Sequence, residues 1–219
     1  MSRLKLAIIC MCFSAAGGVS AEDEALPADI DSVSLSRLPA VERDALDAEG
    51  QRVYDLVAGR DRTTPLLGPG GISLYSPGVA EPMHHLNTYL RQRGVLGPAL
   101  TEVAILVAAW EFEQAYEWAA HEPAARRFGV PDAVIDAIKY DRAVAGLPAQ
   151  ESTVIRFGRE IFREHELSSE TWAEAVGHFG RQGTLELAAV MGDYVMAGVM
   201  LHAVDQRIPP DREDTLPRR

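Results

Sequence analysis

Apolar residues recur at helical spacing along most of the chain. Between residues 44 and 58, Leu46, Val53 and Val57 fall on one face of a helix, which Gly59 ends. Later helices are marked by serine or proline in the first turn and often by glycine beyond the last. They are predicted over residues 76–93, 98–127, 132–145, 149–165, 170–179 and 181–204. No segment alternates apolar and polar positions between turns as a strand does, so we expect an all-α, single-domain fold.

A long loop and two polar ends complete this outline. Residues 60–73 contain two prolines and three glycines, and a loop of this length in a small domain is often functional or part of an interface. Residues 22–37 and 211–219 are polar and lack periodicity. We therefore expect a flexible N-terminal arm and a polar tail on either side of a helical domain over residues 38–210.

The first 21 residues have the pattern of a secretory signal peptide. Arg3 and Lys5 precede an apolar run over residues 6–13, and Val19-Ser20-Ala21 forms a small-residue cleavage site. The run is too short to span a bilayer, and no later stretch reaches about 20 uninterrupted apolar residues. We therefore expect a periplasmic or secreted protein with no membrane association once the signal is removed.

Both cysteines of the chain, Cys10 and Cys12, lie in this signal segment. The mature protein is then cysteine-free, without a thiol for a disulfide, a metal or a redox cycle. A lipid anchor on Cys10 is the alternative, but Ala7-Ile8-Ile9 is a poor match to the small residues that precede a lipoprotein cysteine.

The charge and the last helix restrict the choice of partner. The net charge is −11, and it becomes −13 once Arg3 and Lys5 are removed. Nucleic-acid binding requires a basic face, so that class of partner is excluded. Residues 185–204 are apolar on nearly every face of a helix. We expect this helix to form a homo-oligomer interface, or else to be the central core helix of a monomer.

Acidic residues accompany a histidine in the segment over residues 98–127. In one continuous helix Glu113, Glu117 and His121 stand at i, i+4 spacing and share a face, flanked by Gln114 and Trp118. A carboxylate beside an imidazole orients the ring and holds its charged form, which suits proton transfer. The same spacing is also common on a solvated helix face with no chemical role.

Residues 116–126, with the sequence Tyr-Glu-Trp-Ala-Ala-His-Glu-Pro-Ala-Ala-Arg, resemble the signature of carboxymuconolactone decarboxylase-like proteins. Gly129-Val130-Pro131 continues the likeness, and residues 76–80, 100–106 and 185–194 resemble neighbouring segments of that family. The likeness thus covers roughly residues 38–210. It implies the all-helical fold of alkylhydroperoxidase-D-like proteins and assembly into homotrimers or hexamers.

The peroxidase branch of this superfamily places Glu, Cys, Cys and His with eleven, two and three residues between them. The corresponding positions in this chain are Glu102, Gln114, Glu117 and His121, so neither cysteine is present. A thiol peroxidase needs one thiolate to attack the peroxide and a second thiol to resolve the product. Peroxidase activity is therefore not expected.

Glu102 reaches this site only if the chain turns. In one straight helix Glu102 and Glu117 would lie about 22 Å apart, at about 1.5 Å per residue. The family pattern implies two helices that meet near residues 110–114. Glu102 is then a buried general base, or a structural hydrogen-bond acceptor for Tyr116 or His121.

His84 and His85 follow Pro82 on an earlier helix, and only one of two adjacent residues can face the site. The alternatives are that one of them reaches the site or that both lie on the surface. A metal held by Glu117, His121 and one of these histidines is chemically permitted. The Glu-x-x-x-His spacing alone falls short of a full ligand motif, so we expect no metal and no cofactor.

These features predict a lyase or isomerase that transfers protons on a small carboxylated lactone or oxoacid. In that reaction His121 is the acid and base, and Glu117 orients it or shares its proton. A non-catalytic oligomer that binds a small ligand in the same pocket is the alternative. The catalytic residues we expect are Glu102, Tyr116, Glu117 and His121, and the substrate-binding residues are Glu113, Gln114, Trp118, His84 and His85.

The signal segment gives the first testable prediction. Because the sequence changes from apolar to acidic after Ala21, the exported protein is expected to begin at Glu22. Mass spectrometry of the secreted or periplasmic fraction measures this directly. An intact Met1, or a lipid on Cys10 or Cys12, would contradict soluble export.

Overall fold

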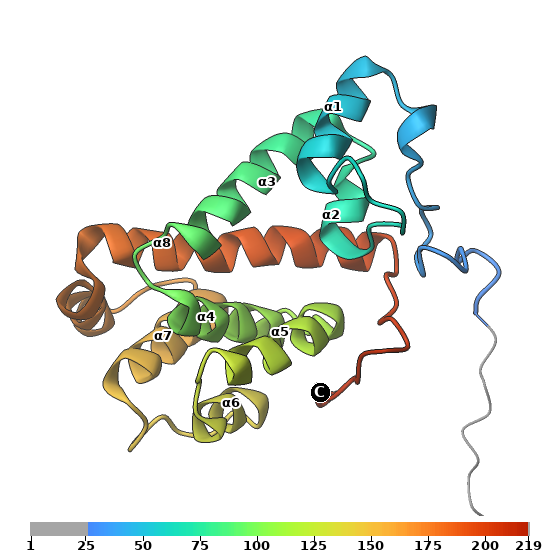
Figure 1. Cartoon of the computed structure of the whole chain (residues 1–219). Helices are drawn as coiled ribbons and strands as arrows, with labels where there is room; N and C mark the ends of the chain where they lie inside the picture. Colours follow the sequence, from blue (N-terminus) through green and yellow to red (C-terminus); the bar gives the residue numbers. More distant parts are fainter. Residues whose placement is uncertain (1–25, 219) are drawn as a thin grey trace, which may run out of the picture.

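The computed structural model describes residues 26–218, so the expected signal peptide and its cleavage site lie outside the described residues (Figure 1). The described part is helical, and its one β-contact is an isolated bridge between Asp31 and Ser36. The all-α prediction is confirmed. The elements are η1 (Arg43–Ala45), α1 (Ala48–Val57), α2 (Gly68–Ser73), α3 (Pro77–Gln92), α4 (Pro98–Glu111), α5 (Ala115–Arg127), α6 (Asp132–Lys139), α7 (Ala149–Arg159), the π-helical turn η2 (Glu160–Glu164) and α8 (Ser169–Ala203).

Helix α4 forms the centre of the domain. All residues from 100 to 110 are buried, and Val103, Ala104, Ile105 and Leu106 have no exposed surface. Helices α5, α6, α7 and α8 pack around it (Figure 1). A helix covered by neighbours all round has no polar face, which explains why the apolar residues of α4 show no stripe.

Helices α1, α2 and α3 form a smaller layer on the other side of α8 (Figure 1). Its own core consists of Val53, Tyr54, Leu74 and Ala80. The predicted loop over residues 60–73 is partly wrong, because its second half forms α2. Two other predicted helices are shorter than expected: the first is divided into η1 and α1, and the fourth ends as α6 at Lys139.

The single helix predicted over residues 98–127 is two helices, as the family resemblance implied. Helix α4 ends at Glu111 and α5 begins at Ala115. Between them Glu113 adopts a left-handed conformation with φ of 52°. The Gln114 side chain accepts a hydrogen bond from the Tyr116 backbone N–H at 3.1 Å and so caps α5. This turn brings α5 back alongside α4.

Helix α8 contains a kink at Gly180, where φ is 67°, so its two parts correspond to the two helices predicted there. By length and composition it is the one described helix that could cross a membrane. More than half of its most apolar stretch is buried, and α4 and α7 pack against the helix. These contacts are those of a core helix.

The described parts of the two polar ends contact each other and the helical domain. The Arg37 N–H donates to the Val204 carbonyl at 2.8 Å, and the Arg207 N–H donates to the Leu35 carbonyl at 2.7 Å. Ser36 is 1% exposed. Farther along, Thr215 accepts a hydrogen bond from the Trp118 indole N–H at 3.1 Å. Backbone and side-chain hydrogen bonds thus connect segments that lack apolar periodicity to the helical domain.

The outer face of α8 is apolar over its second part. Leu185 is 72% exposed and Val199 is 52% exposed. The residues between them on this face are also uncharged, so the face forms one continuous stripe. Its members are Leu185, Ala188, Gly192, Met196 and Val199.

The apolar stripe makes the predicted homo-oligomer testable by mutation. The wild-type protein is expected to sediment as a trimer or hexamer, and the double variant Leu185→Glu, Val199→Glu as a monomer, because each new carboxylate would be desolvated at the interface. Ala173→Glu, on an exposed position before the kink, is the matched control and should not change the assembly. A monomeric wild type in analytical ultracentrifugation would refute the interface.

Candidate active site

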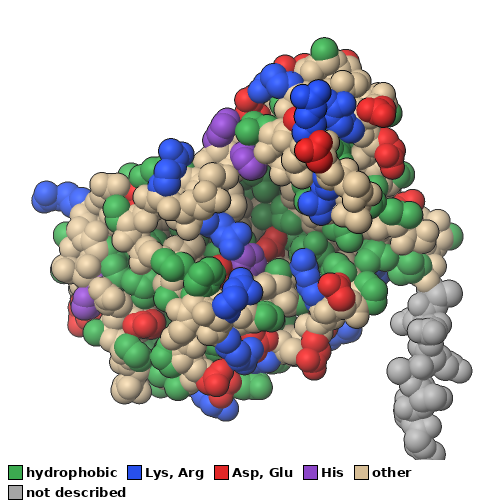
Figure 2. Space-filling model, in the orientation of Figure 1, with side chains coloured by type: hydrophobic (Ala, Val, Ile, Leu, Met, Phe, Trp, Pro, Cys, Tyr) green, Lys and Arg blue, Asp and Glu red, His purple; other side chains and the backbone are tan. Residues whose placement is uncertain are grey.

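A cavity of about 430 Å³ lies between the layer of α1, α2 and α3 and the helices α5 and α8. Figure 2 shows the hollow, with basic, acidic and histidine side chains gathered in it. Its volume falls within the range of small-molecule sites, about 300–1,000 Å³. The polar side chains in its wall are those of Ser73, His84, Asn87, Arg91, Tyr116, Glu117, His121, Asp193, Tyr194 and Arg212.

The imidazole of His121 lies between two carboxylates in the wall of this cavity. Its Nδ1 is 2.6 Å from Glu102 Oε2, and its Nε2 is 3.3 Å from Glu117 Oε2. The Tyr194 ring packs edge-to-face on the imidazole, with 5.0 Å between ring centroids, and fixes its plane. The expected approach of Glu102 to His121 and Glu117 is therefore what the structure shows.

Two opposing effects act on the proton of His121. Burial lowers the pKa of the imidazole, but its hydrogen bonds to Glu102 and Glu117 outweigh burial and raise the pKa above the usual 6.5. With an acceptor at each ring nitrogen, the charged imidazolium donates in both directions. The site thus holds a proton that it can pass to either carboxylate.

The turn between α4 and α5 creates this arrangement. Glu117 and His121 stand one helical turn apart on α5, and Glu102 projects from the first turns of α4. Glu102 is 2% exposed, and its second oxygen accepts from Arg91 Nη2 at 3.2 Å. A lone carboxylate in the core would be strongly destabilising, and Glu102 avoids this with a cationic donor on each oxygen.

Tyr116 also lines the cavity, but it does not serve as the donor to Glu102. Its ring lies 5.2 Å from the Arg212 guanidinium carbon. Burial raises the pKa of its phenol, so the hydroxyl keeps its proton. Gly68 packs against this ring with φ of 71°, and a Cβ there would come within 2.5 Å of the Tyr116 hydroxyl oxygen. A glycine at this position lets α2 close the cavity wall.

Two of the predicted substrate-binding residues lie outside the cavity wall, because α5 begins later than the sequence suggested. Glu113 precedes the helix and is exposed, so it does not share a face with Glu117 and His121. Gln114 is committed to structure: besides capping α5, its amide donates to the Gly198 carbonyl at 3.3 Å. Neither residue lines the main cavity.

Trp118 and His85 also lie outside the cavity. Trp118 is fully buried and donates its indole N–H to Glu122 Oε2 at 2.8 Å, away from the site. The His85 side chain is 61% exposed and lies 3.8 Å from Glu81. Of the two adjacent histidines, His84 is the one that reaches the cavity. Within residues 26–218, no three histidine, cysteine or acidic side chains converge as a metal site.

Asp193 is a site residue that the sequence reasoning missed. Its Oδ2 accepts from Asn87 Nδ2 at 2.8 Å, and its Oδ1 is buried without a hydrogen-bond partner among the described residues. Burial raises the pKa of this carboxyl group. The signal was available, since Asp193 is the one acidic residue in the apolar run from 187 to 204. Arg91 and Arg212 were missed as well, because nothing in their sequence context separates them from surface arginines.

Comparison with known families now places the chain. Residues 77–160, which include α4, α5 and the Glu102–His121 pair, match the model of the carboxymuconolactone decarboxylase family. This part of the chain is therefore similar to that family. No curated protein matches the sequence itself.

Solved structures share the helical fold of this chain. An alkylhydroperoxidase AhpD core, an uncharacterized peroxidase-related protein from Ralstonia eutropha JMP134, is 17% identical with a TM-score of 0.64, over 81% of this chain and 94% of that one. The apo debrominase Bmp8 is 13% identical with a TM-score of 0.60, over 80% of this chain and 92% of that one. Its variant in complex with 2,3,4-tribromopyrrole is 15% identical, with a TM-score of 0.58 over 78% and 90%.

The raised pKa of His121 predicts how stability changes with pH. A histidine whose pKa is higher in the folded state stabilises the fold fully below pH 6.5, and this contribution disappears as the pH rises through the folded-state pKa. Glu102→Gln removes the negative charge beside Nδ1, so the His121 pKa should fall and the pH dependence should weaken. The variant should also lose about 1–3 kcal/mol of unfolding free energy.

Proton NMR titration of the imidazole signals, assigned with His121→Asn, measures the first effect, and urea unfolding across the same pH range measures the second. His85→Asn, on the exposed neighbouring helix, is the control. A His121 pKa below 6.5 in the wild type, or one unchanged by Glu102→Gln, would contradict the assigned role of Glu102.

Proposed function

We propose that this protein is a member of the carboxymuconolactone decarboxylase family, and that it is a lyase or isomerase that transfers protons on a small carboxylated lactone or related oxoacid. The observation that carries the proposal is the His121 imidazole held between Glu102 and Glu117 at the wall of a ligand-sized cavity. Carbon acids next to a carbonyl need a positioned base and a nearby acid, and this cluster contains both.

The proposal gives each residue a distinct part. Glu117 and His121 line the cavity, so they contact the substrate, whereas Glu102 acts from behind the ring. Glu117 removes the proton from the carbon beside the carbonyl, and the electron pair moves onto the carbonyl oxygen as an enolate. His121 supplies a proton to that oxygen or, in an isomerisation, to a second carbon. In a decarboxylation the bond to the carboxylate breaks instead, and His121 protonates the carbon that remains.

The cationic side chains of the cavity favour a substrate that carries a carboxylate. Arg91 and Arg212 both line the wall, and a guanidinium binds carboxylate oxygens with paired donors. With the export expected from residues 1–21, we place the reaction outside the cytoplasm. The substrate is then an extracytoplasmic organic acid.

A non-catalytic ligand-binding oligomer remains the second candidate. It is favoured by the way the polar groups of the site satisfy one another, since Glu102, Arg91 and His121 form one closed network. Thiol peroxidase activity is not proposed. The described residues contain no cysteine, and the Gln114 side chain is committed to capping α5.

Hydrogen–deuterium exchange tests the proposed reaction without knowledge of the product. The wild-type protein is expected to accelerate exchange at the carbon beside the carbonyl in paraconate, a γ-lactone with one carboxylate, or in 2-oxobutyrate, followed by proton NMR in deuterium oxide. His121→Asn and Glu117→Gln should each slow exchange by about 100-fold or more, the usual contribution of a general acid or base.

His85→Asn provides the matched control, because His85 is exposed and lies outside the cavity. It should exchange at the wild-type rate. If the probes bind to the wild type and no exchange is observed, the result would contradict the enzyme and favour the non-catalytic ligand-binding protein.

A further inference from the structure

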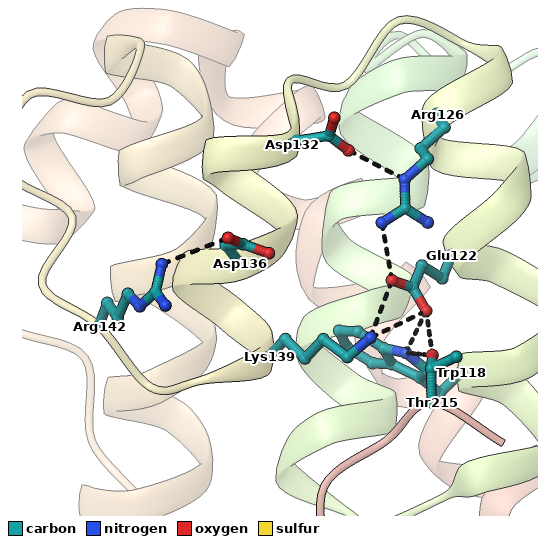
Figure 3. Close-up of polar contacts among 8 residues, drawn as sticks. All are labelled: Trp118, Glu122, Arg126, Asp132, Asp136, Lys139, Arg142 and Thr215. Atoms are coloured by element: carbon teal, nitrogen blue, oxygen red, sulfur yellow. Dashed lines mark hydrogen bonds and ion pairs between the residues drawn. The ribbon is translucent and has the colours of Figure 1, made fainter.

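Another buried carboxylate, Glu122, follows His121 in sequence but does not line the cavity. Figure 3 shows it among Trp118, Arg126, Lys139 and Thr215. Its Oε1 accepts from Arg126 Nη2 at 2.9 Å and from Lys139 Nζ at 3.1 Å. Its Oε2 accepts from the Trp118 indole N–H at 2.8 Å. Burial alone would raise the pKa of Glu122, but its hydrogen bonds outweigh burial and lower it. Glu122 is therefore a fixed anion.

One further donor to Glu122 comes from the segment that follows α8. The Thr215 hydroxyl donates to Glu122 Oε2 and accepts from the Trp118 indole N–H at 3.1 Å (Figure 3). Leu216 packs against the edge of the main core. These contacts hold residues 204–218 against α5, and Figure 1 shows this segment descending from the end of α8 beside α5.

The same segment carries Arg212 to the cavity. Arg212 lines the main cavity and a neighbouring hollow, and its guanidinium carbon lies 5.2 Å from the centre of the Tyr116 ring. The other arginine of the cavity, Arg91, already pairs with Glu102 at 3.2 Å. Within residues 26–218 the contacts found for the Arg212 side chain are with Tyr116, and no ion pair joins it to a carboxylate. Its charge is available to a ligand.

We propose that Arg212 binds the carboxylate of the ligand, and that the Thr215–Glu122 contact is the latch that holds Arg212 at the cavity. The assignment rests on the proposed function for the class of substrate, a small organic acid. Glu122, the anchoring residue of the latch, lies on α5, the helix that also carries Glu117 and His121. The segment after α8 and the proton-transfer residues are thereby attached to the same helix.

Electrostatics explain why the cavity needs this arginine. Glu117 and Asp193 line the wall and repel an entering carboxylate. Arg91 is partly neutralised by its contact with Glu102. A guanidinium that is not paired with a carboxylate offsets that repulsion. The Tyr116 ring and hydroxyl restrain its orientation, and its remaining donors can bind carboxylate oxygens.

Calorimetric titration of the full chain with paraconate and with its uncharged methyl ester separates charge recognition from cavity fit. The wild type is expected to bind paraconate at least about 10-fold more tightly than the ester. Arg212→Ala should weaken paraconate binding by about 10- to 100-fold, the effect of losing one charge-assisted hydrogen-bonded pair, and should leave ester binding unchanged. Arg207→Ala removes the same charge from the same segment outside the main cavity, and it should match the wild type.

The latch is tested with a pair of variants at one position. Thr215→Val loses the hydroxyl and should reduce the preference for paraconate over the ester, because Arg212 is no longer held. Thr215→Ser retains the hydroxyl and should restore the preference. Circular dichroism checks that each variant is folded.

Several results overturn the assignment: equal wild-type affinity for acid and ester, no wild-type binding of paraconate, or a paraconate Kd unaffected by Arg212→Ala. Equal behaviour of Thr215→Val and Thr215→Ser refutes the latch. The proposed reaction can be refuted independently of this assignment. If paraconate binding depends on Arg212 but no hydrogen–deuterium exchange occurs, the reaction is wrong and the role of Arg212 in binding stands.

Discussion

The burial of Glu102 constrains the whole site. A carboxylate in the innermost helix of the domain must receive donors from its surroundings, because its desolvation would otherwise strongly destabilise the fold. Those donors come from two other helices, Arg91 on α3 and His121 on α5. The angle between α4 and α5, the position of α3 and the orientation of the imidazole ring are therefore linked through one side chain.

Two other buried acidic residues in this fold also join separate elements. Glu186 on α8 accepts from the Tyr89 hydroxyl at 2.7 Å and from the Val95 N–H at 2.7 Å, which joins α8 to the end of α3. Glu122 joins α5 to α6 and to the segment after α8. Asp193 is the exception, because one of its oxygens has no partner within residues 26–218. This incompletely satisfied acid lines the ligand cavity, where a bound molecule can supply the missing donor.

The sequence was sufficient for the fold class, most helices and the His121–Glu117 pair, because helical spacing and local motifs are properties of neighbouring residues. The break between α4 and α5 was not visible, since Glu113 adopts a left-handed conformation without being glycine. That one residue explains why Glu113 and Gln114 were assigned to the site. Arg212 was out of reach for a different reason: its place depends on how Thr215 and Glu122 meet across more than ninety residues of chain.

The two positions at which the peroxidase pattern has cysteines carry Gln114 and Glu117 in this chain, and each of these residues has a defined contact. Gln114 stands where the resemblance would place the first cysteine, and its amide caps α5 and binds the Gly198 carbonyl. Glu117 stands where it would place the second, and its carboxylate lies 3.3 Å from His121. One position thus acquires a structural bond and the other a titratable group, while the Glu102–His121 contact is present beside both. In the proposed reaction Glu117 replaces the thiol as the reactive group, and the imidazole between two carboxylates supplies the acid, because Glu102 already occupies its other nitrogen.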